Sequence, residues 1–319
     1  MTNDSNWLRL ALRWRGSIAP KVFPGVLLCG GFGFFVSLLD YFGFSVSWPG
    51  FDIVITNVSY NLVLGLLLVF RTNTAYERFW EGRKAWGTLT ASIRSLGHLI
   101  WVSITETELR DRDNKVSTLR LLIAFAVATK LHLRQQPINS ELEALMTPEQ
   151  FLKLKAVKFT PLQLAVWIGD YLQQQYHRNL VTPNQLTAMN VLVNELLEAI
   201  TTCERILSTP IPLAYAIYLK RLLLIYCLSL PFQVVNTLHW WTSPFAVILS
   251  FVLLGIEEIG TEIENPFGDD ANDLPLEEIC TTILNNIEDV ITLNSQDKLE
   301  VTSPELELTP HSSSLDLPS

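Results

Sequence analysis

Residues 53–70 read IVITNVSYNLVLGLLLVF, and this stretch decides the class of fold because no charged side chain lies between Asp52 and Arg71. A helix that crosses a bilayer needs roughly 20 mostly apolar residues, with a range of about 17–25. The stretch fits one such helix. Charged residues make up only 17% of the 319 residues, against roughly 25% in an ordinary soluble domain. We therefore expect an integral membrane protein.

Two more stretches without charge lie at residues 22–39 and 222–256. The first fits one transmembrane helix, but the second is too long for one. Its middle holds the sequence His239-Trp240-Trp241-Thr242-Ser243-Pro244. Trp favours the interface between lipid and water, and Ser-Pro favours a turn, so we expect two helices joined by a short outer loop. The chain is thus predicted to have four transmembrane helices.

The basic residues predict the orientation in the membrane. They gather before the first span, after the second and before the third, at Arg9, Arg13, Arg15, Lys21, Arg71, Arg78, Arg83, Lys84, Arg94, Lys220 and Arg221. The two outer loops, near residues 40–52 and 239–244, contain no Lys or Arg. Because basic residues flank the cytoplasmic ends of transmembrane helices, both termini are expected in the cytoplasm, or in the stroma of a plastid.

Between the second and third spans the sequence predicts a helical cytoplasmic body. Thr-Pro-X-Gln occurs at residues 147–150, 160–163 and 182–185, where Thr at the N-cap and Gln at the third position form a capping box. After the last box an apolar stripe recurs in steps of three and four, at Leu186, Met189, Val193, Leu196, Ile200, Cys203 and Leu207. Residues 111–114 are expected to form a polar loop. The sequence lacks the period-two pattern of strands, so the predicted fold class is all-α, with a cytoplasmic helical bundle.

These observations divide the chain into six segments. They are an amphipathic segment on the inner leaflet at 1–21, the first and second transmembrane helices at 22–72, a cytoplasmic helical region at 73–210, the third and fourth transmembrane helices at 211–260, a cytoplasmic motif and helix at 261–294, and an acidic tail at 295–319. The tail is rich in Ser, Thr and Pro and is expected to be disordered.

The residues that usually carry enzyme chemistry are scattered along the chain. The five histidines show no metal-ligand spacing and have no partner Cys or paired carboxylates nearby. The four cysteines lie far apart and are expected to be free thiols. Gly30-Gly31-Phe32-Gly33 lies inside the first span, where small residues mark close helix contacts rather than a phosphate loop. The sequence therefore predicts neither an enzyme nor a required cofactor.

The second span carries two kinds of side chain. Polar residues gather in its first half, at Thr56, Asn57, Ser59 and Asn61. Apolar residues share one face at i, i+4 spacing, at Val58, Leu62, Leu66 and Phe70. Such a helix is either buried against its neighbours or lines a pore, with a polar entrance leading to an apolar constriction that closes by dewetting. The residues alone favour neither reading.

Two dense polar runs follow the second and fourth spans. The first, residues 71–87, reads RTNTAYERFWEGRKAWG and contains no Pro, which predicts that the helix continues into the cytoplasm with paired charges along it. The second, residues 257–276, reads EEIGTEIENPFGDDANDLPL, in which Asn-Pro-Phe-Gly is a turn that stops the fourth helix. Its acids are hard oxygen ligands, but their spacing does not match the calcium loop of an EF-hand. Asn272 or Asp273 could instead cap the next helix, with Pro275 in its first turn, and the residues favour this structural role.

Residues 71–87 and 262–276, in this order and within a four-span layout, resemble the two signature segments of the bestrophin family. The resemblance covers nearly the whole chain except the tail. It is closest to the bacterial and chloroplast branch, which includes the voltage-dependent chloride channels of thylakoids. It implies a homopentamer around a central pore that is lined by the second helix of each subunit. The neck of that pore would lie at Leu62, Leu66 and Phe70, on the face that the spacing also groups together.

The resemblance implies two further sites. A cytoplasmic restriction would lie near residues 209–212, at Ile211. In the animal branch an acidic cluster after Asn-Pro-Phe-Gly binds calcium, and here Asp270 and Asp273 match its ligands while the two residues between them dilute the cluster. Ion binding at these two aspartates is thus an expectation, and calcium gating is in doubt. The resemblance further implies that the tail regulates opening by docking on the cytoplasmic body.

Together these features predict the pore-forming subunit of an anion channel that conducts chloride and other small anions, in a bacterial inner membrane or a thylakoid membrane. A cation-selective channel of the same fold is the first alternative, and Glu257, Glu258 and Glu262 would favour it if they faced the conduction path. A polytopic membrane enzyme conflicts with the scattered histidines. A secondary transporter conflicts with four spans that lack an inverted repeat. No nucleic-acid partner is expected.

Overall fold

The computed structural model describes residues 13–14, 16–44, 46 and 58–301, and its regular structure in these ranges is helical throughout, as predicted. The elements are α2 (Ala19–Tyr41), α4 (Val58–Ser103), α5 (Asp111–Leu133), α6 (Ser140–Glu143), α7 (Pro148–Lys155), α8 (Thr160–His177), α9 (Pro183–Ser208), α10 (Leu213–Leu238), the 3₁₀ turn η1 (His239–Trp241), α11 (Thr242–Glu262) and α12 (Leu276–Val301).

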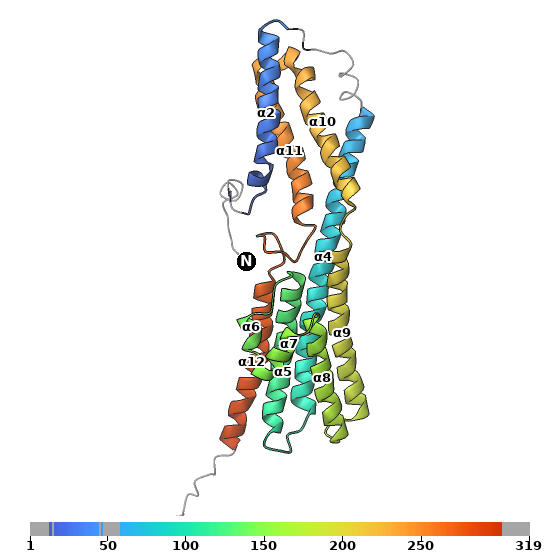
Figure 1. The fold of residues 1–319 in the computed structure, drawn as a ribbon, viewed down its shortest axis with the longest axis vertical. Coiled ribbons are helices and arrows are strands. Elements are labelled where there is room, and N and C mark those ends of the chain that lie inside the picture. Colours follow the sequence, from blue (N-terminus) through green and yellow to red (C-terminus); the bar gives the residue numbers. More distant parts are fainter. Residues whose placement is uncertain (1–12, 15, 45, 47–57, 302–319) are drawn as a thin grey trace, which may run out of the picture.

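The molecule is elongated and has two ends that α4 connects (Figure 1). At one end α2, α10 and α11 lie together, with α2 packed along α11. At the other end α5, α8, α9 and α12 pack with the second half of α4 into a bundle that has one continuous apolar core. The helix α4 runs without a break from Val58 to Ser103, which confirms that the second predicted span continues into the polar body.

Three stretches in the described part of the chain are long and apolar enough to cross a membrane. They are α2, α5 and the region Leu213–Glu262 that contains α10 and α11. Most of α5 is buried inside the bundle, so its apolar composition is explained by packing against other helices. The second predicted span begins at residues outside the described ranges, Thr56 and Asn57 among them, and the number of four transmembrane helices remains a prediction.

The turn between α10 and α11 lies where the Trp and Ser-Pro signals predicted it. Helix α2 is held against this turn, because the hydroxyl of Ser37 donates to the carbonyl of His239 at 3.0 Å. The hydroxyl of Ser243 in turn donates to the carbonyl of Gly30 at 2.9 Å. A Cβ atom at Gly30 would lie 2.4 Å from Cγ2 of Val247. Gly30 and Gly33 therefore serve close helix packing, as expected, whereas a Cβ atom at Gly31 would meet no other atom within 4 Å.

Local sequence signals explain most helices of the bundle. Complete capping boxes start α7 at Thr147 and α9 at Thr182, as predicted. The predicted stripe of α9 lies in the core or packs against it. The box predicted at Thr160 is wrong, because the helix already includes Thr160 and Phe159 at the N-cap makes no side-chain hydrogen bond.

Two boundaries differ from the predictions. Residues 111–114 do not form a loop, because Asp111 begins α5 and its carboxylate accepts hydrogen bonds from the backbone amides of Thr107 and Glu108 at 2.9 Å. An acid at this position also complements the helix dipole, and the Asp111 pKa is lowered, chiefly by Arg178. Helix α12 continues to Val301, beyond the boundary expected at residue 294, since no Pro interrupts the sequence before residue 304. Residues 302–319 of the predicted tail and most of the predicted amphipathic segment 1–21 lie outside the described ranges.

Candidate functional site: the α4 face and the junction beneath it

The predicted neck residues lie on one exposed face of α4. The side chains of Leu62, Leu66 and Phe70 are 67%, 49% and 55% exposed in the single chain. On another face of the same helix, Leu64 and Leu68 are buried in a small core shared with α10. Burial against the other helices of the same chain is therefore excluded for the neck face. What remains is a surface directed toward lipid or toward other copies of the chain.

Directly after this face, Arg71 turns into the chain and joins the two signature runs. Its side chain is 2% exposed, and Nη2 donates to Glu264 Oε2 at 2.7 Å and to Thr261 Oγ1 at 3.4 Å. The side chain passes over α11 at Gly260, where a Cβ atom would lie 3.4 Å from Arg71 Cγ. The other carboxylate oxygen of Glu264 accepts the backbone N–H of Ile211 at 2.9 Å. One ion pair thus connects α4, the end of α11 and the loop before α10.

Arg78 makes the second connection between these segments. Its guanidinium donates to three backbone carbonyls, those of Glu264 at 3.1 Å, Ile206 at 2.7 Å and Thr209. These carbonyls belong to the turn after α11, to the last turn of α9 and to the following loop. A planar side chain with five fixed donors suits this task, whereas a Lys ammonium lacks the geometry. Arg78 therefore positions the loop that carries Ile211.

The third connection is a close contact between Gly82 of α4 and the Asn-Pro-Phe-Gly turn. A Cβ atom at Gly82 would lie 3.0 Å from Cζ of Phe267 and 3.1 Å from Cγ of Pro266. Phe267 is completely buried. The residues that meet the turn and the end of α11, at positions 71, 78 and 82, are spaced so that they share one face of the helix. The first signature run therefore contacts the second through three residues on one face of α4.

Replacing Gly82 by Ala should destabilise the protein by about 1–3 kcal/mol, because the added methyl group must displace the buried ring of Phe267. Gly87 on the same helix is a matched control, since a Cβ atom there meets no other atom within 4 Å. Gly87→Ala should stabilise by roughly 1 kcal/mol through its higher helix propensity. Thermal unfolding of the two variants in detergent should move in opposite directions. Equal shifts would show that Phe267 yields freely and that Gly82 is not required by packing.

Ile211, the predicted cytoplasmic restriction, lies close to the end of the neck face. It borders a hollow of about 440 Å³ together with Phe70, Arg71, Thr74, Arg78 and Tyr215. The hydroxyl of Tyr215 donates to the carbonyl of Leu67 at 2.8 Å and fastens the start of α10 to α4. The structure thus brings Phe70 and Ile211 to the same hollow. The roles of these residues in a pore remain predictions.

The predicted ion ligands Asp270 and Asp273 lie in the turn after α11. Oδ2 of Asp273 accepts the backbone N–H of Asp270 at 2.7 Å, and Lys21 Nζ lies 3.3 Å from Asp270 Oδ2 and 3.6 Å from Glu262 Oε1. Burial raises the pKa of Asp273. The ammonium of Lys21 thus offsets part of the charge of Asp270 and Glu262. Ion binding at Asp270 and Asp273 stays a prediction. In the described ranges no three His, Cys, Asp or Glu side chains gather as a metal-binding group.

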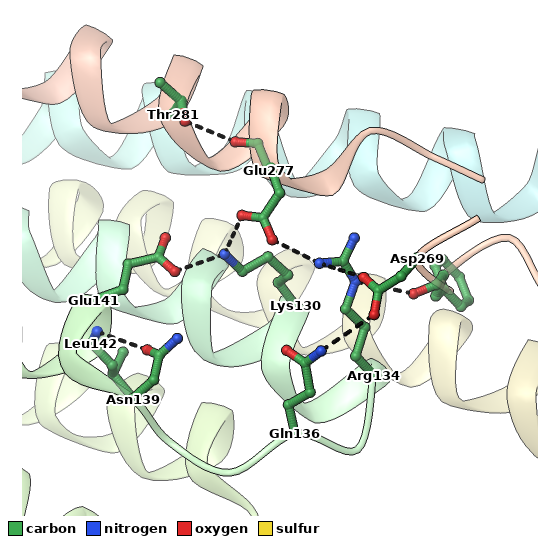
Figure 2. A network of polar contacts seen from close by, with 10 residues as sticks. Lys130, Arg134, Gln136, Asn139, Glu141, Leu142, Asp269, Glu277 and Thr281 are labelled. Carbon is green, nitrogen blue, oxygen red and sulfur yellow. Dashed lines mark hydrogen bonds and ion pairs between the residues drawn. The ribbon is translucent and has the colours of Figure 1, made fainter. Parts of the chain in front are cut away.

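A polar network that the sequence did not predict fixes the same turn to the bundle (Figure 2). Lys130 is 2% exposed and donates to Glu141 at 2.8 Å and to Glu277 at 2.6 Å. Arg134 lies 2.7 Å from Glu277 and 3.0 Å from Asp269. Burial opposes the charge of Lys130, but the two carboxylates outweigh it and raise its pKa, while Lys130 lowers that of Glu277. The one signal in the sequence was a lysine inside the apolar run of α5, which requires an acidic partner when buried.

The comparisons with known proteins agree with this geometry. Residues 1–289 match the family model described as bacterial/fungal bestrophin protein. A voltage-dependent anion channel-forming protein of Nostoc is 53% identical over 289 residues, which covers 91% of this chain and 93% of the relative. A protein of the same description from Synechocystis is 52% identical, over 90% of this chain and 92% of the relative. A crystal structure of a bacterial bestrophin homologue from Klebsiella pneumoniae superposes with a TM-score of 0.73 at 26% identity, over 85% of this chain and 99% of that one. The chain described here belongs to the bacterial and fungal bestrophin family.

Proposed function

We propose that this chain is the pore-forming subunit of an anion channel, assembled as a homopentamer in which α4 of each copy lines the pore. The observation that carries the proposal is the exposed apolar face Leu62, Leu66 and Phe70, on a helix whose Leu64 and Leu68 are buried against α10. Relatives that share half of the sequence are described as voltage-dependent anion channel-forming proteins, which supports the same assignment.

The mechanism that we propose is passive conduction through an apolar neck. An anion that is weakly hydrated loses less free energy than a strongly hydrated cation when part of its water is removed. Apolar walls therefore favour chloride and larger anions, and they close the path when the neck dewets. The hollow bordered by Phe70 and Ile211 would form the cytoplasmic exit, and the connections through Arg71 and Arg78 would couple its shape to α11.

Two of the three acidic residues that would favour a cation channel, Glu257 and Glu262, have internal partners. Glu257 is buried and lies 3.3 Å from Lys220, and Glu262 lies 3.6 Å from Lys21. Their charge is compensated inside the chain, which supports anion over cation selectivity.

The proposal includes four transmembrane helices, both termini in the cytoplasm or stroma, and a bacterial inner membrane or thylakoid membrane as the location. It requires no cofactor.

The reversal potential of the purified protein in planar bilayers under a KCl gradient tests this function. We expect a reversal potential close to the equilibrium potential of chloride. A reversal potential close to the equilibrium potential of potassium would show that the channel selects cations, and it would overturn the anion assignment. No current over a wide range of voltage and calcium concentration would contradict the channel itself. The mass of the detergent-solubilised particle tests the pentamer separately.

A further inference from the structure

A groove that the channel function does not use lies between α2 and α11, and no residue of α4 lines it. Its volume is about 490 Å³. Arg13, Trp14 and Ser17 line one end, and Phe23, Ile248 and Phe251 are among the apolar residues that line the rest. Trp14, Phe23, Ile248 and Phe251 are all exposed in the chain, so a large apolar surface remains open here.

The chain bends back to form the closed end of this groove. Gly16 has a φ of +75°, a backbone conformation that favours glycine, and the bend is completed by a hydrogen bond from the amide of Ser17 to the carbonyl of Trp14 at 3.4 Å. The segment between α11 and α12, residues 263–275, is called the signature turn below. Its Asn272 donates to the carbonyl of Gly16 at 3.3 Å. Lys21 holds the start of α2 to the same turn through Asp270. The signature turn therefore fixes Arg13 and Trp14 at the groove.

The groove is polar at one end and apolar along its length. Its apolar residues follow α2 from Ala19 to Val26 and α11 from Val252 back to Val247, a rise of about 10 Å on α2. In the proposed orientation the start of α2 is at the cytoplasmic surface, so the polar end lies at the headgroup level and the apolar part points toward the middle of the bilayer. Trp is enriched at that level, and a cationic side chain there attracts anionic lipid. This order of polarity matches a phospholipid.

We propose that the groove binds one anionic phospholipid of the cytoplasmic leaflet, with its phosphate against Arg13 and an acyl chain along Phe23, Ile248 and Phe251. The proposal rests on the membrane orientation given above but not on ion conduction. It makes the signature turn responsible for a lipid site as well as for the junction with α4.

Native mass spectrometry of the full-length protein in detergent, with phosphatidylglycerol or phosphatidylcholine added, tests the proposal. We expect the wild type to retain phosphatidylglycerol in preference to phosphatidylcholine. Arg13→Gln should weaken retention of phosphatidylglycerol about five-fold, the factor that one cationic side chain contributes near an anionic surface. Arg110→Gln, at an exposed position at the start of α5, is the matched control and should leave retention unchanged.

Filling the groove provides a second, independent variant. Ile248→Trp should reduce retention of both lipids about ten-fold or more, because each CH₂ group excluded from the groove costs a factor of about four. Leu28→Trp adds the same side chain to an exposed site of α2 outside the groove and should have no effect. Equal retention in Ile248→Trp and Leu28→Trp would overturn the proposal. A density map in phosphatidylglycerol nanodiscs that shows residues 1–12 or a neighbouring subunit in the groove would also overturn it.

This readout does not depend on current. A protein that retains the lipid but passes no ions would leave the groove standing and contradict the channel. A protein that conducts chloride but retains both lipids equally in all variants would support the channel and contradict the lipid site.

Discussion

Simultaneous replacement of Leu62, Leu66 and Phe70 by Ala should raise the open probability of the proposed channel. The three side chains form the exposed face of α4, and their truncation widens the neck and lets water remain in it. At roughly 25 cal/mol per Å², about 60 Å² of apolar wall is worth about 1.4 kcal/mol, and the three truncations to Ala together remove more than this area. A change of about 1.4 kcal/mol corresponds to a factor of ten. We therefore expect the open probability to rise by at least about ten-fold.

Single-channel recording in planar bilayers measures this effect, and the open-state conductance should rise in the same recordings. The matched control replaces two leucines and one phenylalanine on α2, Leu27, Leu28 and Phe35, which are similarly exposed. The buried leucines that hold α4 to α10 are unchanged in both variants, so the subunit should fold in each. Unchanged conductance and gating in the α4 variant would remove this face from the pore. A changed particle mass would show that the face joins subunits rather than lining the path.

The second large effect is expected from Arg78→Met. Met approximates the length and apolar stem of the side chain but leaves the carbonyls of Ile206, Thr209 and Glu264 without their donor. A hydrogen bond to a charged group contributes about 1.5–3 kcal/mol, and Arg78 is half-buried, so we expect a loss of about 3 kcal/mol. This loss corresponds to a fall in unfolding temperature of roughly 5 °C.

Thermal unfolding of the full-length protein in detergent provides the measurement, with Arg83→Met as the control. Arg83 is an exposed arginine on the same helix, and its loss should leave the unfolding temperature nearly unchanged. Arg78→Met should also alter the current, because the loop that holds Ile211 loses one of its attachments to α4. Equal unfolding temperatures for the two variants would show that the loop is held by other contacts. Arg78→Lys should restore little, since one ammonium cannot reach all three carbonyls in the geometry of the guanidinium.

Local patterns in the sequence predicted the elements whose cause is local. The capping boxes at Thr147 and Thr182 and the stripe of α9 depend on residues three or four positions apart, which adjoin in any helix. The uncharged stretches and the turn at 239–244 depend on composition, which bilayer thickness converts into helix length. The grouping of Leu62, Leu66 and Phe70 on one face has the same origin. The resemblance to bestrophins rested on two runs of sequence and required no structure.

The contacts between distant segments could not be predicted in this way. Arg71 and Glu264 are separated by 193 residues, and the sequence of neither run indicates that these two residues form an ion pair. The sequence around Lys130 does not identify a partner for this lysine, and only the structure gives it two carboxylates, from α6 and α12. Likewise Asp111 reads as a loop residue until the arginine that pairs with it, from the end of α8, is known.

The sequence by itself determined that this chain is helical, that it enters a membrane, and that one helix carries an apolar face into a polar body. These properties follow from periodicity and from the exclusion of charge, which act over a few turns of helix. Only the tertiary structure decided that this face is exposed, that Arg71, Arg78 and Gly82 meet the Asn-Pro-Phe-Gly turn, and that Lys21 occupies the acidic cluster. Those outcomes depend on which helices pack together. The fold sets which residue pairs with a buried charge and which side chain fills the space beside a glycine.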